Sequence, residues 1–138
     1  MAYATQQEYT TRFGGQHVEV SADLNDDCSP DGDAITAALD DACSIIDSYI
    51  GKRYATPLAD PAPNVIKRLT LEIADYYLSK DMGPYTEEKR QRYDDAMMFL
   101  CKVSKGELCI AGATMLPNTR VQYTTDTRQL TRDKFQGC

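Results

Sequence analysis

Apolar side chains recur at three- and four-residue spacing in three long stretches, which is the pattern of helices that each bury one face. The spacing predicts one helix over about residues 34–53, one over about 65–80, and one that starts after Thr86 and ends at Lys105. The expected buried positions are Ile35, Ala38, Leu39, Ala42, Ile46, Tyr49 and Ile50 in the first, Val65, Ile66, Leu69, Ile73, Tyr76 and Tyr77 in the second, and Tyr93, Ala96, Met97, Leu100 and Val103 in the third.

A fourth, shorter helix is predicted near the N-terminus. Thr5-Gln6-Gln7-Glu8 matches the capping box, in which a threonine oxygen accepts a backbone N–H and a glutamate reaches back. The box predicts a helix from about Gln6 to Phe13, ended by Gly14-Gly15. The next residues, His17-Val18-Glu19-Val20, alternate over too short a stretch to decide between a strand and a helical turn.

Single polar residues indicate where the long helices start and end. Asp33 is expected to cap the first, and Asn64 is expected to cap the second. Thr86 is expected to cap the third, and Gly106 is the residue type preferred just after a helix end.

Helical periodicity disappears after Gly106. Residues 107–138 start with Leu108 and Ile110, pass through Pro117-Asn118 and continue into the β-prone stretch RVQYTTDT. A segment of this length without an apolar stripe does not easily fold alone, so we expect it to order on another subunit or another protein. The alternative is that it packs back on its own domain as an edge strand.

The sequence therefore predicts an all-α fold. It consists of a small bundle of about four helices over residues 1–106 and an extended, partly β-prone C-terminal arm over residues 107–138.

Charge is distributed unevenly along the 138 residues. The net charge of −6 argues against a general nucleic-acid binder, which relies on neutralising phosphates. Between Arg12 and Lys52 there are nine acidic residues and no Lys or Arg, whereas the stretch from Arg120 onwards has four basic residues against two acidic ones. An acidic body thus carries a mildly basic arm.

Membrane and redox signals are weak. No stretch approaches the roughly 18 apolar residues of a membrane span, and the N-terminus lacks the layout of a signal peptide, so we expect a cytosolic protein with no membrane partner. The five cysteines include no CxxC pair and are expected to be reduced thiols.

The stretch Asn25 to Asp33, NDDCSPDGD, has the alternating acids and glycine of a calcium loop. With Gly32 at the sixth loop position, Asp27 and Asp31 fall at ligand positions, but the twelfth position, where a glutamate should bind, is Ala38. We therefore favour a helix start over a metal site.

No catalytic constellation is evident. His17 is the only histidine, and neither a GxxxxGK[ST] nor a GxGxxG motif occurs. Adjacent carboxylates on a helix point about 100° apart and do not converge. We expect no enzymatic activity, no cofactor and no metal.

The ordered landmarks of the chain do resemble a known family. They are MAYATQQEYTTRFG, AITAALDDACSIIDSYIGKRYATPL, a proline-rich link into VIKRLTLEIADYYL, EEKRQRYDDAMMFLCKVSKGEL, and finally RQLTRDKFQG. This set, which covers nearly the whole chain, is similar to the small head-tail connector proteins of Mu-like bacteriophages and prophages.

The resemblance implies a structural adaptor in the virion neck, assembled in the host cytoplasm. About twelve copies would form a ring beneath the portal protein, bind a tail-side neck or tail-terminator protein, and leave a channel through which DNA passes as non-specific cargo. The alternative is a tail-completion protein or another small helical adaptor.

The resemblance also implies candidate contact residues. In related adaptors the C-terminal segment reaches the portal, so the expected portal contacts are Arg120, Arg128, Leu130, Arg132, Lys134 and Phe135. Acids that could line the channel or a subunit contact are Asp26, Asp27, Asp31, Asp40, Asp41 and Asp47.

Overall fold

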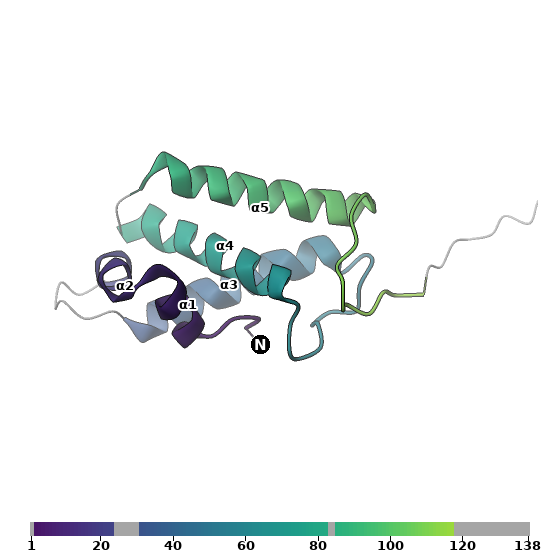
Figure 1. Cartoon of the computed structure of the whole chain (residues 1–138), viewed down its shortest axis with the longest axis horizontal. Coiled ribbons are helices and arrows are strands. Elements are labelled where there is room, and N and C mark those ends of the chain that lie inside the picture. The colour runs from purple at the N-terminus through teal and green to yellow at the C-terminus, as the bar shows by residue number, and fades with distance from the viewer. Residues whose placement is uncertain (1, 24–30, 83–84, 118–138) are drawn as a thin grey trace, which may run out of the picture.

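The computed structural model describes residues 2–23, 31–82 and 85–117. This part of the chain contains five α-helices and no strand, so the all-α prediction is confirmed. The helices are α1 (Gln6–Phe13), α2 (Gly15–Ala22), α3 (Gly32–Ile50), α4 (Asn64–Met82) and α5 (Glu87–Lys105) (Figure 1).

The three long helices form the body. They run alternately in opposite directions along the long axis, and α4 contacts both α3 and α5 (Figure 1). The short helices α1 and α2 pack against α3 and α4 at one end of this body. The core between the long helices includes Ile46, Ile66, Ile73 and Leu100, all fully buried.

The two N-terminal helices meet at Gly14. The capping box of α1 is confirmed, because the Glu8 N–H donates to Thr5 Oγ1 at 3.2 Å and the Thr5 N–H donates to Glu8 Oε2 at 2.9 Å. Gly14 has φ +84°, a conformation open to glycine, and it ends α1 just before α2 starts. The stretch left undecided around Val18 is therefore helical, and α2 buries Val18, Ser21 and Ala22 at helical spacing.

Two of the predicted helix starts are displaced. Asp31 occupies the N-cap of α3, although its side chain makes no capping hydrogen bond, and Asp33 lies in the first turn. The expectation that Asp33 caps this helix is therefore wrong. Asn64 is already the first helical residue of α4, because the carbonyl of Pro63 accepts the N–H groups of Ile66 and Lys67. The expected caps Thr86 and Gly106 are confirmed for α5.

Helix α3 ends three residues earlier than the pattern predicts. Gly51 N–H donates to the Asp47 carbonyl, and the N–H groups of Arg53 and Tyr54 both donate to the Ile50 carbonyl, which closes the helix in a turn. The segment that follows has cis peptide bonds before Pro57 and Pro61. It is packed on the body, because Tyr54, Leu58 and Ala62 are buried.

None of the helices in the described part of the chain combines the length and the apolar character of a membrane-spanning helix.

Candidate functional site

Six polar side chains lie together inside the bundle, between the short and the long helices. This buried polar cluster consists of Tyr9 from α1, His17 and Ser21 from α2, Asp75 and Ser79 from α4, and Lys89 from α5. The side chain of Lys89 is 9% exposed and that of Asp75 only 4%. A buried ammonium and a buried carboxylate are stable only when both are paired and hydrogen-bonded.

Asp75 is at the centre of this cluster. Its Oδ1 atom lies 2.7 Å from His17 Nε2, 3.0 Å from the Tyr9 hydroxyl and 3.5 Å from Lys89 Nζ. Lys89 also donates to the hydroxyl of Ser79 and lies 3.2 Å from His17 Nε2. Burial, together with the charge of Asp75 and its hydrogen bond, raises the pKa of the Tyr9 hydroxyl well above its ordinary value.

The geometry of the cluster differs from that of a nucleophilic triad. In a triad the carboxylate orients one ring nitrogen and the nucleophile contacts the other. Here Asp75 and Ser21 both approach Nε2 of His17, at 2.7 and 3.4 Å, so the ring has no separate nitrogen to relay a proton between them. The cluster can tie four helices together through charge-assisted hydrogen bonds.

The buried polar cluster was not predicted from the sequence, although the sequence contains a signal for it at Lys89 and Asp75. Lys89 lies 7, 11 and 14 positions before Ala96, Leu100 and Val103, so it continues the buried stripe of α5. Asp75 likewise falls within the buried run that includes Ile73 and Leu78. A charged residue in line with an apolar stripe indicates an internal partner, but not which residue the partner is.

The predicted acidic contacts do not converge. Asp40 and Asp41 are exposed on the outer side of α3, whereas Asp31 is at its start. Asp47 is half-buried and accepts a hydrogen bond from the Tyr3 hydroxyl. Asp26 and Asp27 lie outside the described residues. In the part of this set that the structure describes, Asp40 and Asp41 are the exposed acids, whereas Asp31 and Asp47 are partly buried.

The residues from Gly32 onwards also bear on the calcium-loop alternative. The sixth to twelfth loop positions, Gly32 to Ala38, are already α-helical, and Ala38 is buried against the core. A helical segment cannot wrap around an ion as such a loop does. Among the described residues, no group of three or more His, Cys, Asp or Glu side chains is arranged to hold a metal ion.

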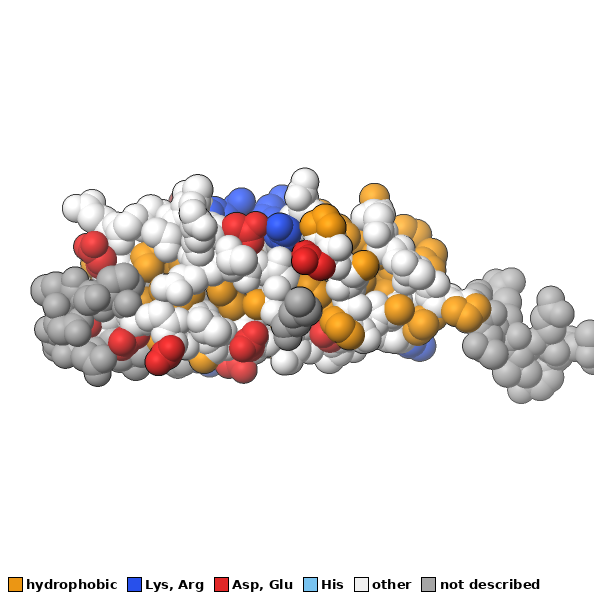
Figure 2. Space-filling model, turned by 90° about the horizontal axis from the view of Figure 1, so that it is seen from below, with side chains coloured by type: hydrophobic (Ala, Val, Ile, Leu, Met, Phe, Trp, Pro, Cys, Tyr) orange, Lys and Arg blue, Asp and Glu red, His pale blue; other side chains and the backbone are white. Residues whose placement is uncertain are grey.

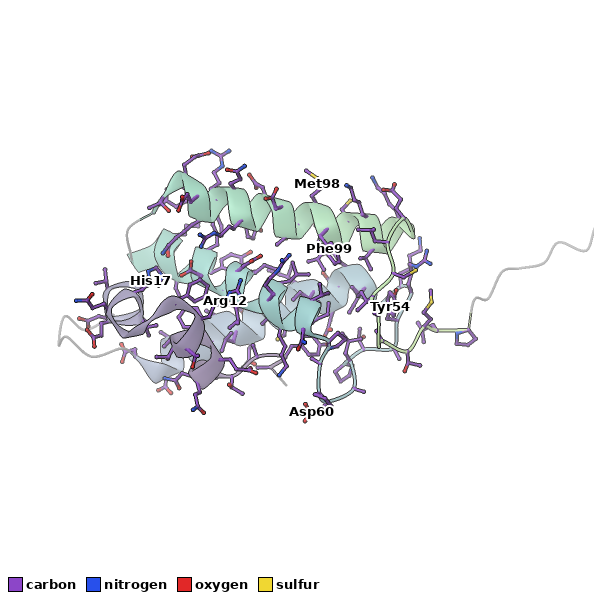
Figure 3. All side chains as sticks on the ribbon, viewed as in Figure 1. Arg12, His17, Tyr54, Asp60, Met98 and Phe99 are labelled. Carbon is purple, nitrogen blue, oxygen red and sulfur yellow. The ribbon has the colours of Figure 1, made fainter. Side chains whose placement is uncertain are left out.

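The start of the C-terminal arm is anchored on the body through Tyr54. The hydroxyl of this buried side chain accepts the Ile110 N–H at 2.9 Å, and its backbone forms an antiparallel bridge with Met115. The Leu116 N–H donates to the Arg53 carbonyl at 2.8 Å. Figure 3 shows Tyr54 at the opposite end of the bundle from His17. The six expected portal contacts, Arg120, Arg128, Leu130, Arg132, Lys134 and Phe135, lie outside the described residues.

Beside this anchor is a cavity of about 550 Å³ with a cationic rim. Its lining residues are Lys52, Arg53, Ser104, Lys105, Met115, Leu116 and Pro117. Three basic side chains therefore lie beside apolar side chains where the first residues of the arm contact the body.

Comparison with known proteins gives a consistent picture. The profile of a family described as "Bacteriophage Mu, Gp36" matches residues 3–126. The chain is 36% identical over 108 residues to the "Mu-like prophage FluMu protein gp36" of Haemophilus influenzae, an alignment that covers 78% of this chain and 74% of that protein. It is 29% identical over 108 residues to "Gene product J" of Escherichia phage Mu, with the same coverage of 78% and 74%.

Proposed function

The chain belongs to the bacteriophage Mu Gp36 family, and from this membership we infer that it acts in phage structure or morphogenesis. Within that role we propose that it is a non-enzymatic head-tail connector. About twelve copies form a ring beneath the portal protein in the virion neck, bind a tail-side neck or terminator protein, and leave a channel for DNA.

The observation that carries the proposal is the family match, which spans both the helical body and part of the arm, over residues 3–126. The shape of the molecule supports it. The body is an elongated bundle, and the described start of the arm, residues 107–117, is anchored through Tyr54 at one end of it (Figure 1). A ring built from such subunits can present every arm towards the same neighbouring ring.

The charge of the body is compatible with a DNA channel. Asp40 and Asp41 are exposed on α3, and no Lys or Arg occurs between Arg12 and Lys52 to neutralise them locally. If these carboxylates line the channel wall, they repel phosphates, so DNA passes without being held; the alternative is that they lie at a contact between subunits. An electron-microscopy structure of the ring with these acids on its outer rim would contradict the channel role.

The arm provides the test of portal binding. Removal of residues 120–138 is expected to abolish binding to purified portal protein, because Leu130 and Phe135 supply apolar anchors and the neighbouring cations supply polar contacts. Binding is measured by surface plasmon resonance with immobilised portal.

A milder variant, Leu130→Ala/Phe135→Ala, keeps the length of the arm and is expected to weaken binding by at least about tenfold. A matched control is Val20→Ala, which truncates an exposed apolar side chain on α2 and is expected to leave binding unchanged. If the truncated chain binds portal as tightly as the full chain, the arm is not the portal contact.

The position in the particle separates the connector from a tail-completion protein. Electron microscopy of particles carrying a tagged chain should place the label between the portal and the tail. A label on free tails that have not yet joined a head would support the tail-completion alternative instead.

A further inference from the structure

We propose that the basic groove at the base of the arm binds the acidic outer face of α3 from a second copy of this chain. The basic groove is the cavity lined by Lys52, Arg53 and Lys105 together with Met115 and Leu116. The acidic face consists of the exposed residues Asp33, Asp40 and Asp41 with the small side chains around them. This inference rests on the proposed ring, because it names the surfaces through which neighbouring subunits join.

Among the described residues, nothing compensates the positive charge of the groove. No Asp or Glu of this part of the chain lines it, and none of Lys52, Arg53 and Lys105 forms an ion pair with another described residue. The Nε atom of Arg53 is buried and has no hydrogen-bond partner among these residues. A buried N–H of a charged group is destabilising when unpaired, so the charge of Arg53 is not fully satisfied by the described residues.

The groove is also built to hold its arginine in place. The guanidinium of Arg53 lies against the Cα of Gly106, where any side chain would collide with it. Met115 and Leu116 beside it are 47% and 42% exposed. Apolar side chains next to a positioned arginine are typical of contact surfaces between proteins.

The acidic face of α3 offers the matching chemistry. Thr36, Ala37 and Ser44 are exposed beside Asp40 and Asp41, so short side chains leave the carboxylates accessible. Neither Asp40 nor Asp41 has an ion-pair partner in the described part of the chain. In Figure 2 acidic side chains occupy the left and central parts of the visible face, and hydrophobic ones are densest towards the right end, near the grey residues.

The two surfaces cannot meet within one copy. Asp40 lies within α3 and Lys52 just beyond its end, so twelve residues, or about 18 Å of helical rise, separate them. A rigid helix holds them apart, and the pairing must join two molecules. A contact that uses different surfaces on the two partners repeats from copy to copy, which generates a ring when the rotation closes.

Charge exchange tests the pairing. Lys52→Glu/Lys105→Glu and Asp40→Lys/Asp41→Lys are each expected to reduce self-association by at least about tenfold, because each places like charges opposite one another. An equimolar mixture of the two variants should associate again, since each surface then meets an opposite one. Sedimentation velocity at low salt measures all three samples.

The control variant is Lys80→Glu/Lys102→Glu. It makes the same change in net charge, and both residues lie in the last turns of their helices, as Lys105 does. It therefore reproduces any loss of favourable interaction with the helix dipoles, while it leaves the groove intact. Its self-association should equal that of the unmodified chain.

A second measurement does not depend on variants. The unmodified chain, mixed as isotopically light and heavy forms, is treated with a carbodiimide, which joins lysine directly to carboxylates. Mixed light–heavy links between Lys52 or Lys105 and Asp40 or Asp41 support the inference. Links within one chain from these lysines to Asp126 or Asp133 would show that the arm fills its own groove, and would overturn it. A chain that stays monomeric at its highest soluble concentration would also overturn it.

The test of the subunit contact and the test of the connector role can fail independently of each other. If the chain is found in the virion neck but shows neither the charge rescue nor the mixed links, the connector stands and the assigned surfaces do not. If the links form but the chain is absent from the neck, the surfaces stand and the connector role does not.

Discussion

Gly106 shows how one position can serve two requirements. Its φ of +87° ends α5 in the left-handed conformation that side chains disfavour. The same residue leaves room for the guanidinium of Arg53, which lies directly against it. The first requirement follows from local helix-end chemistry, but the second arises only because the end of α3 is packed beside the end of α5.

Gly106→Ala is therefore expected to lower the free energy of unfolding by about 1 to 2 kcal/mol, mainly from the strained backbone, because the tip of the arginine can shift aside. Urea denaturation measures the change. The matched control is Gly15→Ala in α2, where no atom lies within 4 Å of the added carbon and the backbone is helical. That control should be neutral or stabilising by up to about 1 kcal/mol. Equal losses in both variants would contradict this account.

The buried polar cluster attaches the short helices α1 and α2 to the body, because these two helices bury little apolar surface of their own. α1 and α2 are only eight residues each, and they bury few apolar side chains apart from Tyr9, Val18 and Ala22. Helices of this length are not stable alone, so their position depends on contacts with the body. His17 and Tyr9 connect them to Asp75 on α4, and Lys89 connects the same carboxylate to α5.

Lys89→Met should lower the free energy of unfolding by about 3 kcal/mol, because Asp75 remains buried with its cation removed. Thermal and urea unfolding measure the loss. The control Lys102→Met, on the exposed side of α5, should change stability by less than about 0.5 kcal/mol.

The double variant Asp75→Leu/Lys89→Met should recover part of the loss, since it removes both charges and not just one. If the loss of unfolding free energy in the double variant equals the sum of the losses in the two single variants, the two residues are energetically independent.

The molecule is held together along its length by side chains that connect the N-terminus to distant segments. The Tyr3 hydroxyl donates to Asp47 on α3 and accepts the Leu58 N–H at 3.1 Å, which links three parts of the chain. On the surface, Lys67 Nζ lies 2.9 Å from Glu8 and Arg12 lies 3.4 Å from Glu72. The exposed pairs contribute little individually, so the buried tyrosine is the more important of these links.

This link makes stability sensitive to alkaline pH. Burial and the hydrogen bond to Asp47 raise the pKa of Tyr3 from 10.0 to about 12. The protonated phenol is favoured in the folded state, so its contribution is complete below pH 10 and is lost as the pH rises through about 12. Tyr3→Phe should be less stable than the unmodified chain at neutral pH, and the difference should shrink across this window. Guanidinium unfolding at several pH values measures it, and a difference that stays constant would contradict the assignment.

Much of the helical body could be predicted from the sequence because its signals are local. The caps at Thr5, Thr86 and Gly106 act within one helical turn, and the buried stripes of the long helices repeat every three or four residues. Where the prediction failed, the competing contact was also nearby: the Pro63 carbonyl starts α4 one residue early, and α3 closes in a turn at Ile50. Helix α2 remained undecided because eight residues carry too few repeats to distinguish a helix from a strand.

The buried hydrogen-bonded pairs could not be predicted from such local patterns. His17 and Asp75 are 58 positions apart, His17 and Lys89 are 72 apart, and Tyr54 and Ile110 are 56 apart. No local pattern encodes such pairs, because each depends on how complete helices pack. Residue order therefore establishes which segments are helical, which face of each is apolar, and where charge accumulates. The packing of α1 to α5 alone decides that a lysine, a histidine and an aspartate share one interior site, and that three basic residues converge at the base of the arm, since these contacts exist only after the helices have docked.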